Sequence, residues 1–530
     1  MSIQSGSSVS SPHAPHDDAD VVVIGAGHNG LVTAAYLAQA GMKVLLLEAR
    51  GSVGGTAASE GFAGATVNIC NCDHLTFRTT PVISELNLAT HGLRYLDVEP
   101  AQMNMTWDGS AAWPIFHDID RTLDALQLLY PGEVEGYRQY LRAALPAVKL
   151  LIEAANDPPS LTGLGRRAVD NRLRGVGTLF RWSRRSASDI MRSYFHAEAL
   201  RAPGLLVGPM VWGISPEFPG SGLGALTYAL RHVATVGRPV GGSGAVPQAL
   251  LSAFLSYGGT LRTSSQVTQI VCDSTGVRGV TLSDGTEIAA ATVVSACDPH
   301  STFVKWLSGA PAQAKDLVQR WSTIPHTQGY ESKIDALMTA IPRFRAADRD
   351  VASKHGFDPD ICTTAVAPSL AEMHRGYGLM GSGQILEQPG MIVNVPTVLD
   401  PSMAAPGTHV LSLEALYTPY NFAAGWTSND EPQRWLGEFS TLVEPGFLDS
   451  LGDWRAMTPA VYETEFFLPQ GHATSFAGGP LAALRNKNPE LTKYETPVPG
   501  LYLTGAATFP GAGVWGASGR NAALVILNTR

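Results

Sequence analysis

The sequence has few cysteines and few charged residues for its length. Its 530 residues include five cysteines, an odd number, and only Cys70 and Cys72 lie close together, so neither a disulfide framework nor a paired-cysteine zinc site is expected. Charged residues make up 16% and hydrophobic residues 45% of the chain, which excludes a disordered polypeptide. The formal net charge of −9 gives no general attraction to nucleic acid, so no nucleic-acid partner is expected.

The sequence also lacks an uninterrupted apolar run that could cross a bilayer. Its longest apolar neighbourhood, residues 21–47, is broken by glycine, polar and charged residues, whereas a spanning helix needs about 20 apolar residues. Residues 1–19 are small and polar and lack the apolar stretch of a signal peptide, so we expect a disordered leader. Together with reduced cysteines, this predicts a cytoplasmic protein.

Residues 20–48 have the pattern of a strand, a glycine-rich turn, a helix and a second strand. The β-branched run 20–24 is followed at once by Gly25-Ala26-Gly27-His28-Asn29-Gly30, then by an apolar helical pattern and a strand over 43–47 that ends on Glu48. In a dinucleotide fold the first glycine permits the turn, the second lets the backbone approach a pyrophosphate, and the third lets the helix pack on the strand. Glu48 is placed to accept hydrogen bonds from ribose hydroxyls.

The residues behind Glu48 distinguish FAD from NAD. Glu48-Ala49-Arg50 is followed by Gly54-Gly55-Thr56. This Glu-x-Arg-x-x-x-Gly-Gly arrangement resembles the second fingerprint of the glutathione-reductase-type FAD proteins, in the branch that holds amine oxidases and phytoene desaturases. The resemblance implies FAD as the cofactor. Thr56 stands where amine oxidases commonly have arginine, which argues against that sub-branch.

A second glycine-rich segment lies near the C-terminus. Residues 501–504 predict a short buried strand that Gly505 ends, and Gly511-Ala512-Gly513 precedes a helical pattern from Val514 to Leu527. This segment is similar to the ending of the phytoene desaturase family, in the branch with carotene isomerases, retinol saturases and the "pyridine nucleotide-disulfide oxidoreductase domain-containing" proteins. By that resemblance, the start of this helix lies under the pyrimidine end of the isoalloxazine.

The middle of the chain follows the order of the same family. Gly241–Gly244 precedes a helical pattern, and the strand around Val267 carries the backbone that touches adenine by the resemblance. Two residues depart from the family pattern, because Phe509 stands where the family has histidine and Trp515 where it has a small residue. Both positions face the surroundings of the flavin by the resemblance, so they indicate a reshaped pocket.

These motifs predict an α/β fold, with a Rossmann-like FAD-binding domain of the glutathione-reductase type and an inserted mixed α+β substrate domain. We expect a discontinuous FAD-binding domain over residues 20–80, 235–300 and 458–530, and substrate-binding lobes over 81–234 and 301–457. The abundance of glycine and proline, 55 and 35 residues, agrees with many tight turns between short elements.

Two features of the lobes carry further predictions. Alternation over residues 409–416 predicts a half-buried strand with Ser412 and Glu414 on the opposite face from Leu411 and Leu413. Residues 166–185 contain seven arginines against one acid, Asp170. This basic run is either a solvated helix face or a surface for peripheral contact with a membrane or another anionic partner.

Motifs for hydrolytic or metal catalysis are absent: we find no Ser/His/Asp order, HExxH sequence or paired-cysteine zinc pattern, which leaves the difficult step to the cofactor. We expect hydride transfer from a C–H bond of a largely apolar small molecule to flavin N5, with O2 or a quinone as electron acceptor and a base for the second proton. His472 is the first candidate for this base, and Glu414 and Tyr420 are weaker ones; each also has an ordinary structural interpretation. His28 belongs to the phosphate turn by the resemblance.

The use of the flavin stays open at this point. The alternatives are an FAD-dependent desaturase or dehydrogenase, a redox-neutral isomerase that uses reduced flavin, and a non-catalytic flavoprotein. An amine-like substrate is also open, and the sequence does not indicate an oligomeric state.

Overall fold

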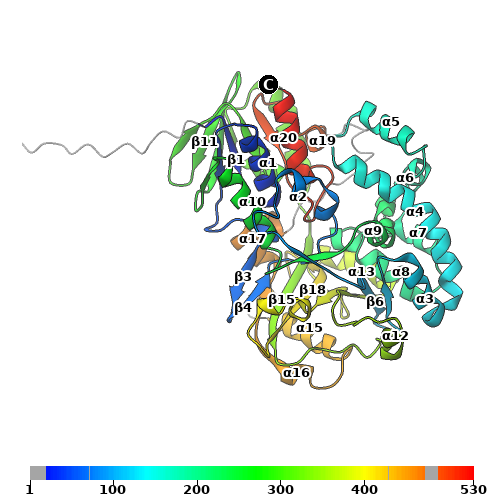
Figure 1. Ribbon diagram of the computed structural model, residues 1–530. Helices are drawn as coiled ribbons and strands as arrows, with labels where there is room; N and C mark the ends of the chain where they lie inside the picture. Colours follow the sequence, from blue (N-terminus) through cyan, green and yellow to red (C-terminus); the bar gives the residue numbers. More distant parts are fainter. Residues whose placement is uncertain (1–18, 71, 428, 472–487, 530) are drawn as a thin grey trace, which may run out of the picture.

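The computed structural model describes residues 19–70, 72–427, 429–471 and 488–529 (Figure 1). The candidate base His472 lies outside these residues, as does the expected leader apart from residue 19. No helix in the described part of the chain combines the length and the apolar character needed to cross a bilayer.

Five strands form a parallel sheet in the order β20-β13-β1-β2-β9. The two glycine-rich segments follow β1 and β20 along the chain. The strands are β1 (Val21–Ile24), β2 (Val44–Leu47), β9 (Thr260–Arg262), β13 (Val293–Ser295) and β20 (Leu501–Leu503). One face packs on α1 (His28–Gln39), α10 (Ala245–Ser256) and α20 (Ala517–Asn528). In Figure 1, α20 lies beside α1, although the two helices come from opposite ends of the chain.

The other face of the parallel sheet packs against a four-stranded sheet in the order β12-β11-β10-β14. Its strands are β10 (Val267–Asp273), β11 (Gly276–Leu282), β12 (Glu287–Ala289) and β14 (Leu307–Ser308), with α11 (Lys315–Thr323) alongside. Since both faces of β1 are covered, every residue of its apolar sequence is buried. The predicted α/β class with a Rossmann-like domain is confirmed.

A second, mixed sheet of seven strands has the order β19-β15-β18-β17-β16-β6-β7. Its pairs are antiparallel except for β16 with β6. The strands are β6 (Gln102–Thr106), β7 (Trp113–Ile115), β15 (Gly329–Met338), β16 (Thr364–Ala367), β17 (Met391–Asn394), β18 (His409–Pro419) and β19 (Leu451–Met457). The short hairpin β3 (Ser59–Phe62) and β4 (Ala65–Asn68) connects this sheet to the nucleotide half.

The prediction of a half-buried strand at 409–416 is wrong in one respect. Ser412 and Glu414 do lie on the opposite face from Leu411 and Leu413, but all residues of β18 after His409 are buried. The reason is that β18 is an interior strand, with β15 and β17 as neighbours and other elements packed on both faces. Glu414 is therefore a buried charge-bearing residue and not a surface one.

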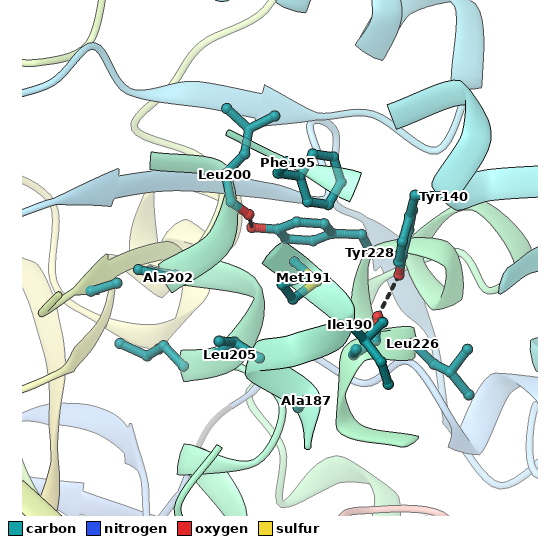
Figure 2. Close-up of a cluster of buried hydrophobic side chains, with 14 of the residues drawn as sticks. Tyr140, Ala187, Ile190, Met191, Phe195, Leu200, Ala202, Leu205, Leu226 and Tyr228 are labelled. Atoms are coloured by element: carbon teal, nitrogen blue, oxygen red, sulfur yellow. Dashed lines mark hydrogen bonds between the residues drawn. The ribbon is translucent and has the colours of Figure 1, made fainter. Parts of the chain in front are cut away.

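A helical lobe covers the β6–β7 end of the mixed sheet. Its helices are α3 (Ile119–Leu129), α4 (Val134–Ala155), α5 (Leu161–Asp170), α6 (Val176–Trp182), α7 (Ala187–Tyr194), α8 (Glu198–Leu206) and α9 (Thr227–Val233). Figure 2 shows Tyr228 at the centre of this lobe, with Phe195 and Met191 on either side and its hydroxyl donating to the Leu200 carbonyl at 2.8 Å. Tyr140 likewise donates to the Ala225 carbonyl at 2.6 Å. These bonds satisfy the hydroxyls of an otherwise apolar core.

The remaining helices pack around the five-stranded parallel sheet and the seven-stranded mixed sheet. They are α2 (Val82–Glu85), α12 (Arg349–Lys354), α13 (Leu370–Gly381), α14 (Pro396–Leu399), α15 (Glu431–Ser440), α16 (Phe447–Ser450), α17 (Pro459–Phe466) and α19 (Glu490–Lys493), and β5 (Tyr95–Asp97) pairs with β8 (Gly237–Pro239).

Candidate functional site

The N-terminal glycine turn has the geometry that a dinucleotide needs. Gly25 has φ of 93° and donates its N–H to the Leu47 carbonyl at 2.8 Å, which turns the chain sharply after β1. A Cβ on Gly30 would lie 2.0 Å from the Gly25 carbonyl oxygen, so α1 packs too closely for any side chain there. A Cβ on Gly27 would meet nothing within 4 Å. The space in front of Gly27 is open, and the first turn of α1 has neither a side-chain cap nor an acidic residue.

Glu48 braces this turn from the end of β2. Its carboxylate accepts the Ala26 N–H at 2.8 Å and the Arg50 N–H at 2.9 Å. Burial raises the pKa of Glu48, and these backbone hydrogen bonds oppose that shift. An ionised carboxylate accepts about four hydrogen bonds, and backbone N–H groups supply two of them here. Glu48 can therefore still accept hydrogen bonds from ribose hydroxyls.

The second fingerprint lies directly against the first. Gly54 has φ of 119° and donates its N–H to the Ala26 carbonyl at 2.8 Å. Gly55, with φ of 55°, begins a short turn of 3-10 helix that also contains the half-buried Thr56. Ala49 is half-buried as well.

Arg50 supplies a direct test of whether an anionic cofactor fits. Its guanidinium pairs with Glu60 and lies over the Phe466 ring, 4.0 Å from its centroid. Its Nη1 is nevertheless buried without a hydrogen-bond partner among the described residues. An orphaned guanidinium N–H, together with an uncapped helix start and an open glycine, fits a diphosphate.

The C-terminal glycine turn meets the N-terminal one through His28. The His28 ring bonds to the backbone of Gly513 and lies 3.1 Å from Asn29 Nδ2. Burial lowers the pKa of His28 to about 4, so the ring is neutral at physiological pH. A Cβ on Gly513 would meet nothing within 4 Å. The structure thus brings both open glycine turns to one place, with His28 between them.

The helices behind these turns cross closely. Thr33 Oγ1 donates to the Gly519 carbonyl at 2.9 Å, and the Gly519 N–H donates to Asn29 Oδ1 at 3.3 Å. A Cβ on Gly519 would lie 2.3 Å from the Asn29 carbonyl oxygen. At the end of β20, Gly505 with φ of 108° donates its N–H to Ser518 Oγ at 3.1 Å.

The predicted start of the C-terminal helix is wrong by three residues. The helix begins at Ala517 and not at Val514, because Gly516 is in a left-handed conformation with φ of 77°. Val514 accepts a hydrogen bond from Thr76 Oγ1 at 3.0 Å. Trp515 is buried with Phe509 against Ala517 and helix α4, and its Nε1 has no hydrogen-bond partner among the described residues.

A layer of buried charges faces the nucleotide half from the mixed sheet. Lys333 on β15 pairs in register with Glu414 on β18, and Glu331 and Asp335 follow the same alternation along β15. The exposed fractions of these four side chains lie between 0% and 3%. Lys333 Nζ donates to the Asn68 carbonyl at 2.8 Å, at the end of the hairpin that follows the second fingerprint.

Two cations contact one acid of this layer. Lys333 and Arg455 pair with Asp335, Arg455 at 3.1 Å. Neither glutamate forms an ion pair with a described residue: Glu331 Oε1 accepts the Cys70 thiol at 3.3 Å, and Glu414 Oε1 is buried with no hydrogen-bond partner in that part of the chain.

Burial also changes the acidity of the two glutamates. Burial raises the pKa of Glu331 to about 7, while the Cys70 thiol and Lys333 oppose the shift. Burial, followed by the negative charge of Glu331, raises the pKa of Glu414 well above its usual value. The pair therefore retains a proton at neutral pH.

The other sequence-predicted residues lie elsewhere. Tyr420 is half-buried just beyond the end of β18, where its hydroxyl contacts Glu463 of α17. That hydrogen bond raises the pKa of Tyr420. Val267 is buried at the start of β10, paired with Leu282.

Sequence reasoning missed three members of the charged layer, Glu331, Lys333 and Asp335. A signal was present, because charges at every second position of a strand mark one face. Such a face is ordinarily expected to be in solvent, so the alternation alone does not indicate a buried site.

Comparisons with known proteins agree with this geometry. Residues 23–85 match the family model of NAD(P)-binding Rossmann-like domains, and residues 168–331 match that of flavin containing amine oxidoreductases. The chain is 28% identical to mouse pyridine nucleotide-disulfide oxidoreductase domain-containing protein 2, with coverage of 96% of this chain and 93% of the relative.

Two bacterial relatives extend over similar lengths. A limonene dehydrogenase subunit of Castellaniella defragrans is 28% identical, with coverage of 96% of this chain and 94% of the relative. Phytoene desaturase (lycopene-forming) of Pantoea ananas is 27% identical, with coverage of 94% and 96%.

Solved structures share the fold at lower sequence identity. Putrescine oxidase bound to putrescine superposes with a TM-score of 0.62 at 14% identity, covering 96% of this chain and 99% of that one. Cyclohexylamine oxidase from Brevibacterium oxydans gives 0.58 at 16% identity, with coverage of 97% and 100%. By its apposed glycine turns and its full-length sequence matches, the chain is similar to FAD-dependent oxidoreductases of the superfamily that includes amine oxidases and phytoene desaturases.

Proposed function

We propose that this protein is a dehydrogenase that forms a C=C bond in a largely apolar small molecule, with the Glu331–Glu414 carboxyl pair receiving the substrate proton. The single observation that carries the proposal is Glu414 Oε1, a buried carboxyl oxygen without a partner among the described residues. It lies on the sheet face that contacts the hairpin following the flavin fingerprint. An unsatisfied buried polar group of this kind calls for a functional reason.

The substrate loses two hydrogens in this reaction. Bound FAD supplies the two-electron acceptor for one of them, which leaves its carbon as hydride. The other leaves as a proton, and the ionised carboxylate of the pair takes it up while the C–H electrons form the new bond. Burial raises the pKa of both carboxyls, that of Glu331 to about 7, so near neutral pH the pair shares a proton and its ionised member accepts the proton from the substrate. Oxygen or a quinone would then reoxidise the cofactor.

The nucleotide half would position the cofactor for this step. The open glycines Gly27 and Gly513 leave room for backbone contact with the diphosphate and the flavin. Arg50 would pair with the diphosphate through its free Nη1, and Glu48 would accept the ribose hydroxyls. We assign the adenine contact to the backbone at Val267 on the family resemblance alone.

Two relatives support an apolar substrate, because limonene dehydrogenase and phytoene desaturase are named for hydrocarbons. Amine oxidation is the second candidate. The match of residues 168–331 to amine oxidoreductases favours it, and a buried carboxyl pair would also hold an ammonium group. Thr56 argues for the first candidate, since amine oxidases commonly have arginine there.

Anaerobic reduction of the bound flavin tests the proposal. The purified FAD-loaded protein is mixed with limonene, with a detergent-solubilised carotene and, separately, with benzylamine, and loss of the oxidised-flavin absorbance is followed. We expect a hydrocarbon to reduce the flavin. Reduction by benzylamine alone would favour amine oxidation, and conversion of substrate only after chemical reduction of the flavin would indicate an isomerase.

The role of the carboxyl pair is tested by Glu414→Gln. Removal of a proton acceptor or its partner lowers such rates by about 10²–10⁴-fold, so we expect flavin reduction to slow by that range with flavin content unchanged. Glu387→Gln, at an exposed position, is the matched control and keeps the rate. A Glu414→Gln variant that reduces its flavin at the wild-type rate would remove the pair from the mechanism.

A further inference from the structure

Helices α5 and α6 form the outer tip of the helical lobe, at the upper right in Figure 1. We call residues 166–185, which span most of these helices and the turn between them, the basic tip. Three large apolar side chains are exposed here: 67% of Val169, 64% of Leu173 and 48% of Phe180. Exposed apolar side chains gathered over so short a stretch of chain commonly mark an interaction surface.

The basic tip also carries most of its positive charge without a counter-ion. Arg167 pairs with Asp157, and Arg166 lies 3.6 Å from Asp170. The other arginines form no ion pair with any described residue; they are Arg172, Arg174, Arg181, Arg184 and Arg185. In a chain of net charge −9, this surface is locally cationic and complementary to an anionic partner.

The turn between the two helices exposes the Leu173 side chain to solvent. Arg172 and Leu173 have φ of 53° and 60°, a left-handed conformation that is unfavourable for side chains of this kind. The guanidinium of Arg184 lies 3.8 Å from the centroid of the Phe180 ring, so a cation and an exposed ring share one side of α6. Apolar and cationic residues thus alternate along the chain of the tip.

We propose that the basic tip binds the surface of an anionic lipid bilayer. Leu173, Phe180 and Val169 would enter the headgroup boundary, and the unpaired arginines would contact lipid phosphates, as in interfacial amphipathic helices. A lipid surface fits better than an acidic protein, because a protein interface has a contiguous apolar core with its charges at the rim. Here the arginines alternate with the apolar residues along the chain, and Arg184 lies over the Phe180 ring.

Vesicle co-sedimentation of the FAD-loaded protein tests this proposal. We expect the protein to sediment with phosphatidylcholine vesicles that contain phosphatidylserine, to bind pure phosphatidylcholine far more weakly, and to dissociate as salt is added. The variant Arg172→Gln/Arg174→Gln/Arg184→Gln should partition about a hundredfold more weakly. Leu173→Ser/Phe180→Ser should lower partitioning by about tenfold or more, because two apolar side chains no longer enter the interface.

Matched controls lie outside the tip. Arg343→Gln/Arg345→Gln removes two exposed arginines, and Leu448→Ser removes an apolar side chain that is 52% exposed; both should bind like the wild type. Flavin content and melting temperature confirm that each variant is folded. The proposal is overturned if the two vesicle types bind equally, if the tip variants bind like the controls, or if an acidic protein is captured while vesicles are not.

Discussion

The two large sheets of this molecule both bury their central strands, but they bury different chemistry. Strand β1 is four aliphatic residues with both faces covered. Strands β15 and β18 are also interior, yet between them they bury Glu331, Lys333, Asp335 and Glu414. Apolar burial stabilises a fold by about 25 cal/mol per Å², whereas a buried charge destabilises it unless it is paired.

The contrast underlies the roles that we propose for the two halves. In the parallel sheet the strands are scaffold, and the turns after β1 and β20 present backbone to a ligand. In the mixed sheet the strands themselves carry ionisable side chains toward the hairpin at Asn68. On the proposed function, the first arrangement would bind the cofactor through glycine and the second would act on the substrate through charge, so substitutions should separate the two.

The largest effect is expected from Gly27→Val. The open space in front of Gly27 leaves the apoprotein free to fold, but a side chain there occupies the place of the diphosphate. Flavin content after purification should fall at least about tenfold, in line with the need for close backbone approach at this position. Gly437→Val, where a Cβ also meets nothing within 4 Å, should keep its flavin. A Gly27→Val protein with full flavin content would contradict this site.

A smaller but still large effect is expected from Lys333→Met. The change removes a cation that contacts Asp335 and the Asn68 carbonyl, and it leaves both groups buried. Breaking a buried ion pair lowers the free energy of unfolding by about 3–5 kcal/mol. Because Arg455 still pairs with Asp335, we expect a loss at the lower end of this range, measured by chemical denaturation. Lys354→Met, at an exposed position of α12, should stay within about 0.5 kcal/mol of the wild type. If both variants lose the same free energy of unfolding, the Lys333–Asp335 ion pair does not stabilise the fold more than an exposed lysine does.

The two halves also differ in how far the sequence predicts them. The first fingerprint depends on local turn chemistry, so the amino-acid sequence alone suffices to assign roles to Gly25, Gly27 and Gly30. The structure agrees for two of them, because Gly25 has φ of 93° and a Cβ on Gly30 would clash with the Gly25 carbonyl. The start of α20 is harder to place, because a glycine at 516 gives no sequence sign that it adopts a left-handed conformation.

The charged layer could be predicted only in part. The alternation at 409–416 assigned Glu414 to the correct face, but its burial depends on pairing between β15 and β18, which lie far apart in the sequence. Nothing local indicates that Glu331 and Glu414 share that face. Long-range pairing of this kind is set by the packing of whole sheets and not by propensity.

The smallest of these effects concerns the pH dependence of stability and is expected from Glu331→Gln. Burial raises the pKa of Glu331 from 4.5 to about 7, so the folded protein binds more protons than the unfolded chain between these values. Stability of the wild type therefore decreases as pH rises from about 4.5 to 7. Glutamine has no such proton, and the variant should be more stable than the wild type by about 3 kcal/mol at pH 8, with little difference at about pH 4.

The comparison is made by denaturation of the FAD-loaded protein at both pH values. Glu387→Gln, on the surface, should follow the wild type at each. The glutamine in the Glu331 variant keeps an oxygen that can accept a hydrogen bond from the Cys70 thiol. The expected gain in stability at pH 8 is therefore not offset by loss of this hydrogen bond. Parallel stability curves for the Glu331 variant and the wild type would mean that this carboxyl is ionised in the folded protein. The charged layer would then resemble an ordinary set of ion pairs, and the proton-holding role of the pair would be lost with it.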